Sequence, residues 1–171
     1  MKVTTSGFCV YSVTYRYMNP KQFLNLNQGR LNACTMFACV NAIYKQFKIQ
    51  LDPIKLWRQA DTNGDGSGLY LDEVCTVLKK QGFSFSKISG GGLGAIKANI
   101  ERGIPVVLSV YAPEIDPKQT GGYHAVVAYK VVGDIIYYIN SWDPTWGPFN
   151  NNTGYFRKTP GSIKWMLLVK K

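Results

Sequence analysis

The chain has 171 residues, a length typical of one domain, and 46% of them are hydrophobic, which excludes a disordered polymer and predicts a globular core. Lys and Arg exceed Asp and Glu by 20 to 10, and the net charge of +10 favours acidic partners, but the basic residues are scattered and no nucleic-acid-binding motif is present. No apolar run is long enough for a transmembrane helix and no signal peptide is evident, so we expect a cytoplasmic protein.

The first half of the sequence is predicted to be mainly helical. The strongest pattern covers residues 33–47, where apolar side chains recur at steps of three and four, with Asn32 in position to cap the helix. Pro53 favours the start of a second helix and Gly82 the end of a third. The predicted elements are an extended segment at 10–17, a turn at 18–21, helices at 33–47, 53–60 and 71–81, a strand at 83–88 and a helix at 93–101.

The second half changes to apolar, β-branched runs typical of strands. Strands are predicted at 104–111, 123–132, 134–141, 154–157 and 163–169. The short turn at Gly133 suits a hairpin. Helices followed by antiparallel strands indicate an α+β fold. We expect a single domain over residues 1–171, in which about 25–103 form a helical subdomain and 104–171 join 1–24 in a β subdomain.

Cys34 is the candidate nucleophile among the four cysteines. It lies in the first turn of the predicted helix 33–47, where the helix dipole favours a thiolate and lowers the thiol pKa. Cys39 points to another face of that helix, and Cys39 and Cys75 are expected to be small core residues. The cysteine spacings do not suit zinc, and we expect no metal and no cofactor.

His124, the only histidine of the chain, begins the predicted strand 123–132. In a hairpin centred between residues 132 and 133, position 124 pairs close to position 140 or 141. Asn140 would therefore lie within reach of His124, accept a ring N–H and aim the other ring nitrogen at a thiol. The sequence thus predicts a Cys-His-Asn triad of Cys34, His124 and Asn140.

Four segments carry a resemblance to a known group of enzymes. They are Gln28-Gly-x-x-x-x-Cys34-x-x-Phe37-Ala38, Tyr123-His124-Ala-Val-Val, Asn140-Ser-Trp142-x-x-x-Trp146-Gly147 and Gly154-Tyr-Phe-Arg157. Together they resemble papain and the cathepsins. The short chain and the strand that follows Gly103 also resemble staphopain-like peptidases and the peptidases that remove double-glycine leaders. The chain is therefore identified as a member of the papain-like cysteine peptidase superfamily, which implies a papain-like α+β fold.

The resemblance implies a thiol-dependent endopeptidase that works through an acyl-enzyme intermediate. Cys34 would attack the scissile carbonyl, His124 would act as base and then as acid, and Asn140 would orient His124. Gln28 and the backbone N–H of Cys34 would form the oxyanion hole.

Substrate contacts and partners also follow from the resemblance. Gly68 would offer backbone groups to an extended substrate, and Trp142 would border the site and shield the His124–Asn140 hydrogen bond from water. The expected partner is a polypeptide substrate, without membrane or nucleic acid, and the protein is expected to be a monomer.

Four alternatives stay open. Asp143 could orient His124 in place of Asn140. The stretch Asp61–Asp65, with Asp72 at the twelfth position, resembles the start of a calcium loop but lacks the usual final Glu, so a turn is favoured. The chain could also be a non-catalytic binding module on the same scaffold, or use the triad for deamidation, transpeptidation or isopeptide cleavage.

Overall fold

A computed structural model describes residues 18–24, 26–29, 31–61, 64, 66, 68–142 and 153–171. The extended segment predicted at 10–17 lies outside these residues, as do Asp65 and Asp143. Within the described ranges, no helix is long and apolar enough to cross a membrane.

Helices and strands follow one another much as the sequence predicts. The helical elements are η1 (Pro20–Gln22), α1 (Cys34–Phe47), α2 (Pro53–Ala60), α3 (Leu71–Lys80), α4 (Leu93–Glu101) and η2 (Ala112–Glu114). The strands are β1 (Ser84–Ser89), β2 (Val106–Tyr111), β3 (Tyr123–Val132), β4 (Ile135–Ile139), β5 (Thr153–Arg157) and β6 (Ile163–Lys170). The predicted α+β class is confirmed.

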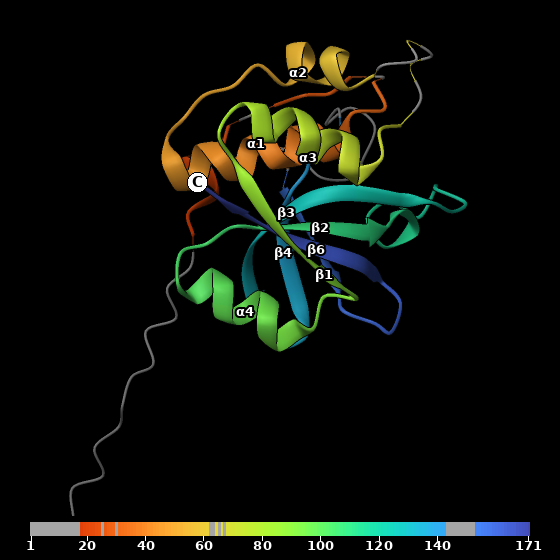
Figure 1. Ribbon diagram of the computed structural model, residues 1–171. Helices are drawn as coiled ribbons and strands as arrows, with labels where there is room; N and C mark the ends of the chain where they lie inside the picture. Colours follow the sequence, from red (N-terminus) through yellow and green to blue (C-terminus); the bar gives the residue numbers. More distant parts are fainter. Residues whose placement is uncertain are drawn as a thin grey trace, which may run out of the picture.

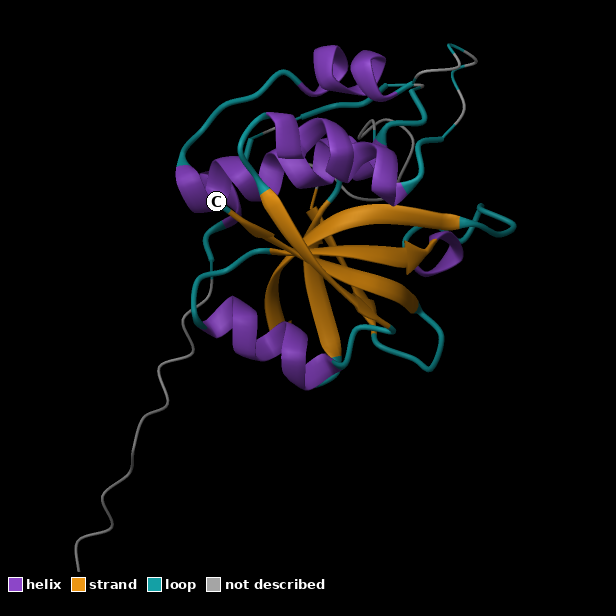
Figure 2. Ribbon diagram, viewed as in Figure 1, coloured by secondary structure: helices purple, strands orange, loops and turns teal. Residues whose placement is uncertain are grey.

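All six strands belong to one antiparallel sheet in the order β1-β6-β2-β3-β4-β5. Helices α1, α2 and α3 gather on one side of this sheet and α4 lies on the other (Figure 1). Figure 2 shows how the strands fan out between the two helical layers. The long helix α1 crosses the middle of the sheet, against β3, β2 and β6, so its N-terminal residue comes to the start of β3.

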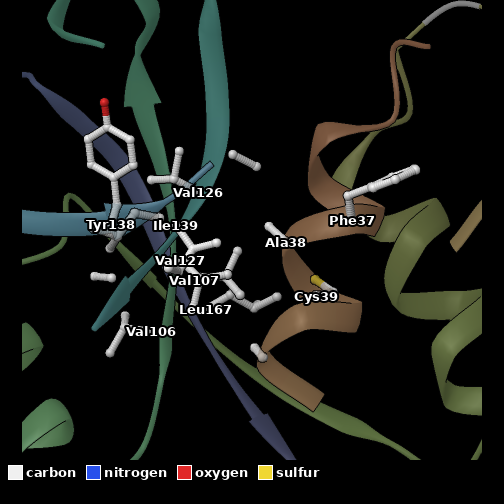
Figure 3. Packing of buried hydrophobic residues seen from close by; sticks show 14 of the residues in the cluster. Phe37, Ala38, Cys39, Val106, Val107, Val126, Val127, Tyr138, Ile139 and Leu167 are labelled. Atoms are coloured by element: carbon white, nitrogen blue, oxygen red, sulfur yellow. The ribbon is translucent and has the colours of Figure 1, made fainter. Parts of the chain in front are cut away.

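Helix α1 is the central buried helix of the fold. The residues Met36–Ile43 are all buried, because the helix has the sheet on one side and α2 and α3 on the other. In Figure 3, Ala38 and Cys39 point toward Val127 and Leu167 of the strands, whereas Phe37 points away from the sheet. Cys39 is fully buried, which confirms its predicted place in the core.

The predicted cap of α1 is wrong. The helix begins one residue after Ala33, which occupies the N-cap position and has no capping side chain. The Asn32 side chain instead donates from Nδ2 to the carbonyl oxygen of Gly66, at 3.1 Å. A contact between two loops has therefore replaced the local cap, and the first N–H groups of α1 have no side-chain acceptor from the N-cap residue.

Gly154 in β5 is expected to tolerate no larger residue. It pairs with Tyr138 of β4, and a Cβ atom added to Gly154 would lie 2.6 Å from Cζ of the buried Tyr138 ring. We expect Gly154→Ala to lower the free energy of unfolding by about 1–3 kcal/mol, measured by urea denaturation. The control is Gly94→Ala in helix α4, where no atom lies within 4 Å of the added Cβ and alanine favours the helix. Equal stability of the two variants would contradict this account of the packing.

Candidate active site

Cys34 is the first residue of α1 and its side chain is partly buried. The backbone N–H of Ala125, the second residue of β3, lies near the sulfur, and it lowers the thiol pKa together with the Thr35 hydroxyl and the backbone N–H groups of Cys34 and Thr35. The thiol therefore lies between the start of a helix and the start of a strand, beside the residue that follows His124.

The expectation of a lowered pKa for Cys34 is wrong for this structure. The nearby N–H and hydroxyl donors do lower the pKa of the thiol, but burial against the sheet is the larger effect and raises it above its ordinary value. Before a substrate is bound, the site consequently holds a neutral thiol rather than a preformed thiolate.

His124 and Asn140 are in direct contact, as the hairpin argument predicts. The ring Nε2 and the amide Oδ1 are 2.7 Å apart, and the His124 side chain is almost completely buried. The backbone N–H of Trp142 also donates to Oδ1 of Asn140, at 3.1 Å. Two donors on Oδ1 require that His124 carries its proton on Nε2, which leaves the lone pair on Nδ1.

Trp142 covers this hydrogen bond. Its ring stacks on the His124 ring, with centroids 3.7 Å apart and an interplanar angle of 29°. Removal from water is the main effect on the imidazole: it lowers the His124 pKa from 6.5 to about 3, and the hydrogen bond to Asn140 offsets only part of that change. His124 is therefore neutral at physiological pH.

Gln28 lies next to the same segment, but its side chain is partly engaged. Its Nε2 donates to the carbonyl oxygen of Leu31 at 2.7 Å, and its Oε1 accepts from the Ser141 hydroxyl at 2.6 Å. A primary amide has two N–H bonds, so one remains for another acceptor. The role of Gln28 in an oxyanion hole stays a prediction.

A groove of about 270 Å³ opens beside Cys34. It lies between the start of α1, the residues before α3 and the ends of the strands β2, β3 and β6. Its lining is formed by Asn32, Ala33, Cys34, Thr35, Met36, Gly68, Leu69, Tyr70, Leu71, Ser109, Tyr123, Lys164 and Trp165. The structure thus brings Gly68 to the same groove as Cys34, whereas Trp142 lies over His124 and not among these residues.

Two solved structures resemble this arrangement. One is assigned as a C39-like peptidase from Bacillus anthracis; it has a TM-score of 0.58 and 13% identity, over 82% of this chain and 90% of that one. The other is the peptidase domain of Streptococcus ComA, a bi-functional ABC transporter involved in a quorum-sensing pathway; it has a TM-score of 0.59 and 14% identity, over 84% of this chain and 95% of that one.

The chain has the papain-like peptidase fold. This confirms the fold implied by the sequence resemblance. No protein-family model and no curated protein matches the sequence. At 13–14% identity the likeness is one of fold.

Ser141 is a residue that the sequence analysis did not single out. Besides the hydroxyl bond to Oε1 of Gln28, its carbonyl oxygen accepts from the backbone N–H of Gln28 at 2.8 Å. Ser141 therefore links the segment that carries Asn140 to the loop that precedes α1 through two hydrogen bonds. In the sequence, the place of Ser141 in the Asn-Ser-Trp segment was the one indication that it has a role at the site.

Replacing Ser141 with alanine is expected to lower stability. The variant leaves the buried Oε1 of Gln28 without its donor, which costs about 1–3 kcal/mol in the free energy of unfolding. Urea denaturation of Ser141→Ala measures this cost, and Ser84→Ala on the exposed β1 strand is the matched control, with a change of about 0.5 kcal/mol or less. Indistinguishable urea midpoints for the two variants would contradict a stabilising role of the hydrogen bond from Ser141 to Gln28.

The rival assignments fall largely outside the described residues. Asp143 and Asp65 are not described, so neither the alternative orienting carboxylate nor the full calcium loop can be placed. The Asp61 carboxylate accepts from the backbone N–H groups of Gly64 and Gly66, as in a turn. Within the described ranges, no group of three or more metal-ligating side chains occurs.

Proposed function

We propose that this chain is a cysteine endopeptidase whose nucleophile, base and orienting residue are Cys34, His124 and Asn140. The observation that supports the proposal most is the 2.7 Å contact between His124 Nε2 and Asn140 Oδ1. His124 is next in sequence to Ala125, whose N–H lies near the Cys34 sulfur and lowers the thiol pKa. A fixed tautomer with its lone pair on Nδ1 is what a base for a thiol requires.

In the first half of the reaction, the proton of Cys34 moves to Nδ1 of His124 as the sulfur attacks the carbonyl carbon of the substrate. The C=O π electrons pass to oxygen, and the negative charge is met by the backbone N–H of Cys34 and the remaining N–H of Gln28. When the C–N bond breaks, His124 returns the proton to the leaving amine. A thioester on Cys34 remains, and water then hydrolyses it with His124 again as base.

The neutral resting state affects when the nucleophile forms. Burial disfavours the thiolate of Cys34 and the imidazolium of His124 when either charge is present without the other. Transfer of one proton from the Cys34 thiol to His124 creates both charges together, and opposite charges attract each other strongly in a site of low polarity. We therefore expect the thiolate to form during attack rather than to be present beforehand.

A peptide library digest tests the proposal. The wild-type protein should produce new peptide termini, identified by mass spectrometry, whereas Cys34→Ala should produce none. The matched control is Cys75→Ala, because Cys75 is a partly buried cysteine of α3 outside the groove, and this variant should cleave like the wild type. Cleavage by Cys34→Ala at the wild-type rate, or no cleavage by the wild type, would overturn the proposal; deamidated or joined peptides without new termini would indicate another use of the triad.

A further inference from the structure

The described lining of the groove beside Cys34 carries one positive charge. Among the thirteen described residues that line it, Lys164 is the one with a formally charged side chain, and none is an aspartate or glutamate. The other members that reach the groove from the strands are Ser109, Tyr123 and Trp165. Whatever enters the groove therefore meets a single positive charge on an aromatic and polar wall.

A β-bulge places Lys164 in this wall. Strand β6 pairs Trp165 with Ser109 of β2, but the next pair joins Ile163 to Val110, so Lys164 is an extra residue without a partner in this ladder. In a regular strand, successive side chains point to opposite faces, whereas here Lys164 and Trp165 line the same groove. Bulges characteristically redirect a side chain in this way near functional sites.

The aromatic ring of Tyr123 contacts the Lys164 side chain. The Lys164 ammonium nitrogen lies 5.1 Å from the centroid of the Tyr123 ring, within the range of a cation–π contact. Tyr123 packs edge-to-face on Tyr111, with centroids 5.9 Å apart. This stacking reduces the number of conformations open to the lysine side chain, whose ammonium N–H groups can still donate to an acceptor on a ligand.

No carboxylate of the described chain neutralises Lys164. The two ion pairs among the described residues join Lys97 to Glu101 and Arg157 to Asp134. Lys164 is exposed, so its charge carries little desolvation cost and is available to a ligand. The net charge of +10 acts in the same direction, because it attracts an acidic ligand over a longer range.

We infer that Lys164 is a specificity residue that binds an acidic side chain of the substrate, an aspartate or glutamate close to the scissile bond. The inference rests on the proposed peptidase function, because it assumes that the groove holds a peptide beside Cys34. The free C-terminal carboxylate of a peptide offers the same chemistry as an acidic side chain. Binding of a side chain is compatible with an endopeptidase, whereas a requirement for the C-terminal carboxylate is not.

The test uses pairs of peptides that differ in one residue, Glu in one and Gln in the other, at each position around the cleavage site. All are amidated at the C-terminus. For the position that meets Lys164, we expect kcat/KM of the wild type to favour Glu about tenfold. Lys164→Met, which keeps the apolar stem, should remove this preference, and Lys164→Glu should reverse it. Lys170→Met, at the exposed far end of the same strand, is the matched control.

Two further measurements separate the possible failures. Binding of the Glu and Gln peptides to Cys34→Ala, by fluorescence anisotropy, should show the same Lys164-dependent preference without any turnover. If that preference appears but the wild type cleaves nothing, the peptidase proposal fails and Lys164 still binds acidic peptides. If the wild type cleaves and binds Glu and Gln peptides equally, or responds only when the C-terminus is a free carboxylate, the inference is overturned while the peptidase proposal stands.

Discussion

Replacing His124 with glutamine is expected to reduce kcat by a factor on the order of 10⁴–10⁶, because glutamine cannot take the proton of Cys34 at neutral pH. His124 is the only histidine, and its tautomer is set by Asn140. Glutamine has a similar size and can still hydrogen-bond to Asn140, but it is not a base. Single-turnover cleavage of a fluorogenic peptide measures the loss.

Asn140→Ala is the informative companion to this variant. It leaves the base in place but removes the acceptor of Nε2, so the expected loss in kcat is large but smaller than that of His124→Gln. Retention of more than a tenth of the wild-type kcat by His124→Gln would show that His124 is not the base. Thermal melting of both variants, read by circular dichroism, checks that they are folded.

Acidification is expected to destabilise the protein through His124. The unfolded ring binds a proton below about pH 6.5, whereas the folded ring does not until about pH 3. Between these values the unfolded state therefore holds more protons, and the free energy of unfolding falls by up to about 1.4 kcal/mol per pH unit, roughly 4–5 kcal/mol in all.

Urea denaturation at several pH values between 7 and 3 measures this loss. Other groups also titrate in that range, so the quantity of interest is the difference between the wild type and His124→Gln. The variant should show a shallower decline with falling pH, and the two curves should run parallel above pH 7. Parallel curves down to pH 3 would mean that the ring is exposed to solvent and not buried beneath Trp142.

Elements with long, regular patterns were predictable from the sequence. The helices 53–60 and 93–101 and the strand 123–132 have the observed bounds, because each has a clear period and a distinct start or stop signal. Strand β1 lies one residue later than predicted, and β4 is shorter at both ends. Such ends depend on neighbouring strands and loops more than on local preference.

The hairpin argument reached the correct contact through an imperfect register. The pairing of β3 with β4 shifts between Ala128 and Lys130, and the regular ladder stops at Val127 and Ile139. Asn140 therefore lies just beyond β4, yet its side chain still reaches His124. A bulge arises from twist and packing across several strands, so alternation along one strand does not reveal it.

Burial and distant contacts explain what sequence reasoning missed at the site. The position of Cys34 at the start of a helix predicted a lowered thiol pKa. The cost of burying a charge against β3 depends on tertiary packing, which the sequence does not show. The place of Lys164 depends on a bulge in β6, and the bond from Ser141 to Gln28 joins residues that are 113 positions apart. The burial of Cys34 and the bulge at Lys164 have no local signature in the sequence, and the contact of Ser141 is signalled only by its place in the Asn-Ser-Trp segment.

That long-range bond also bears on how the molecule is made. During synthesis, Gln28 and Cys34 leave the ribosome more than a hundred residues before Ser141 does. Until His124 and Asn140 have also been made, the proposed base and its amide partner are missing. We therefore expect any peptidase activity to appear only after β3, β4 and the segment at Ser141 have folded against α1.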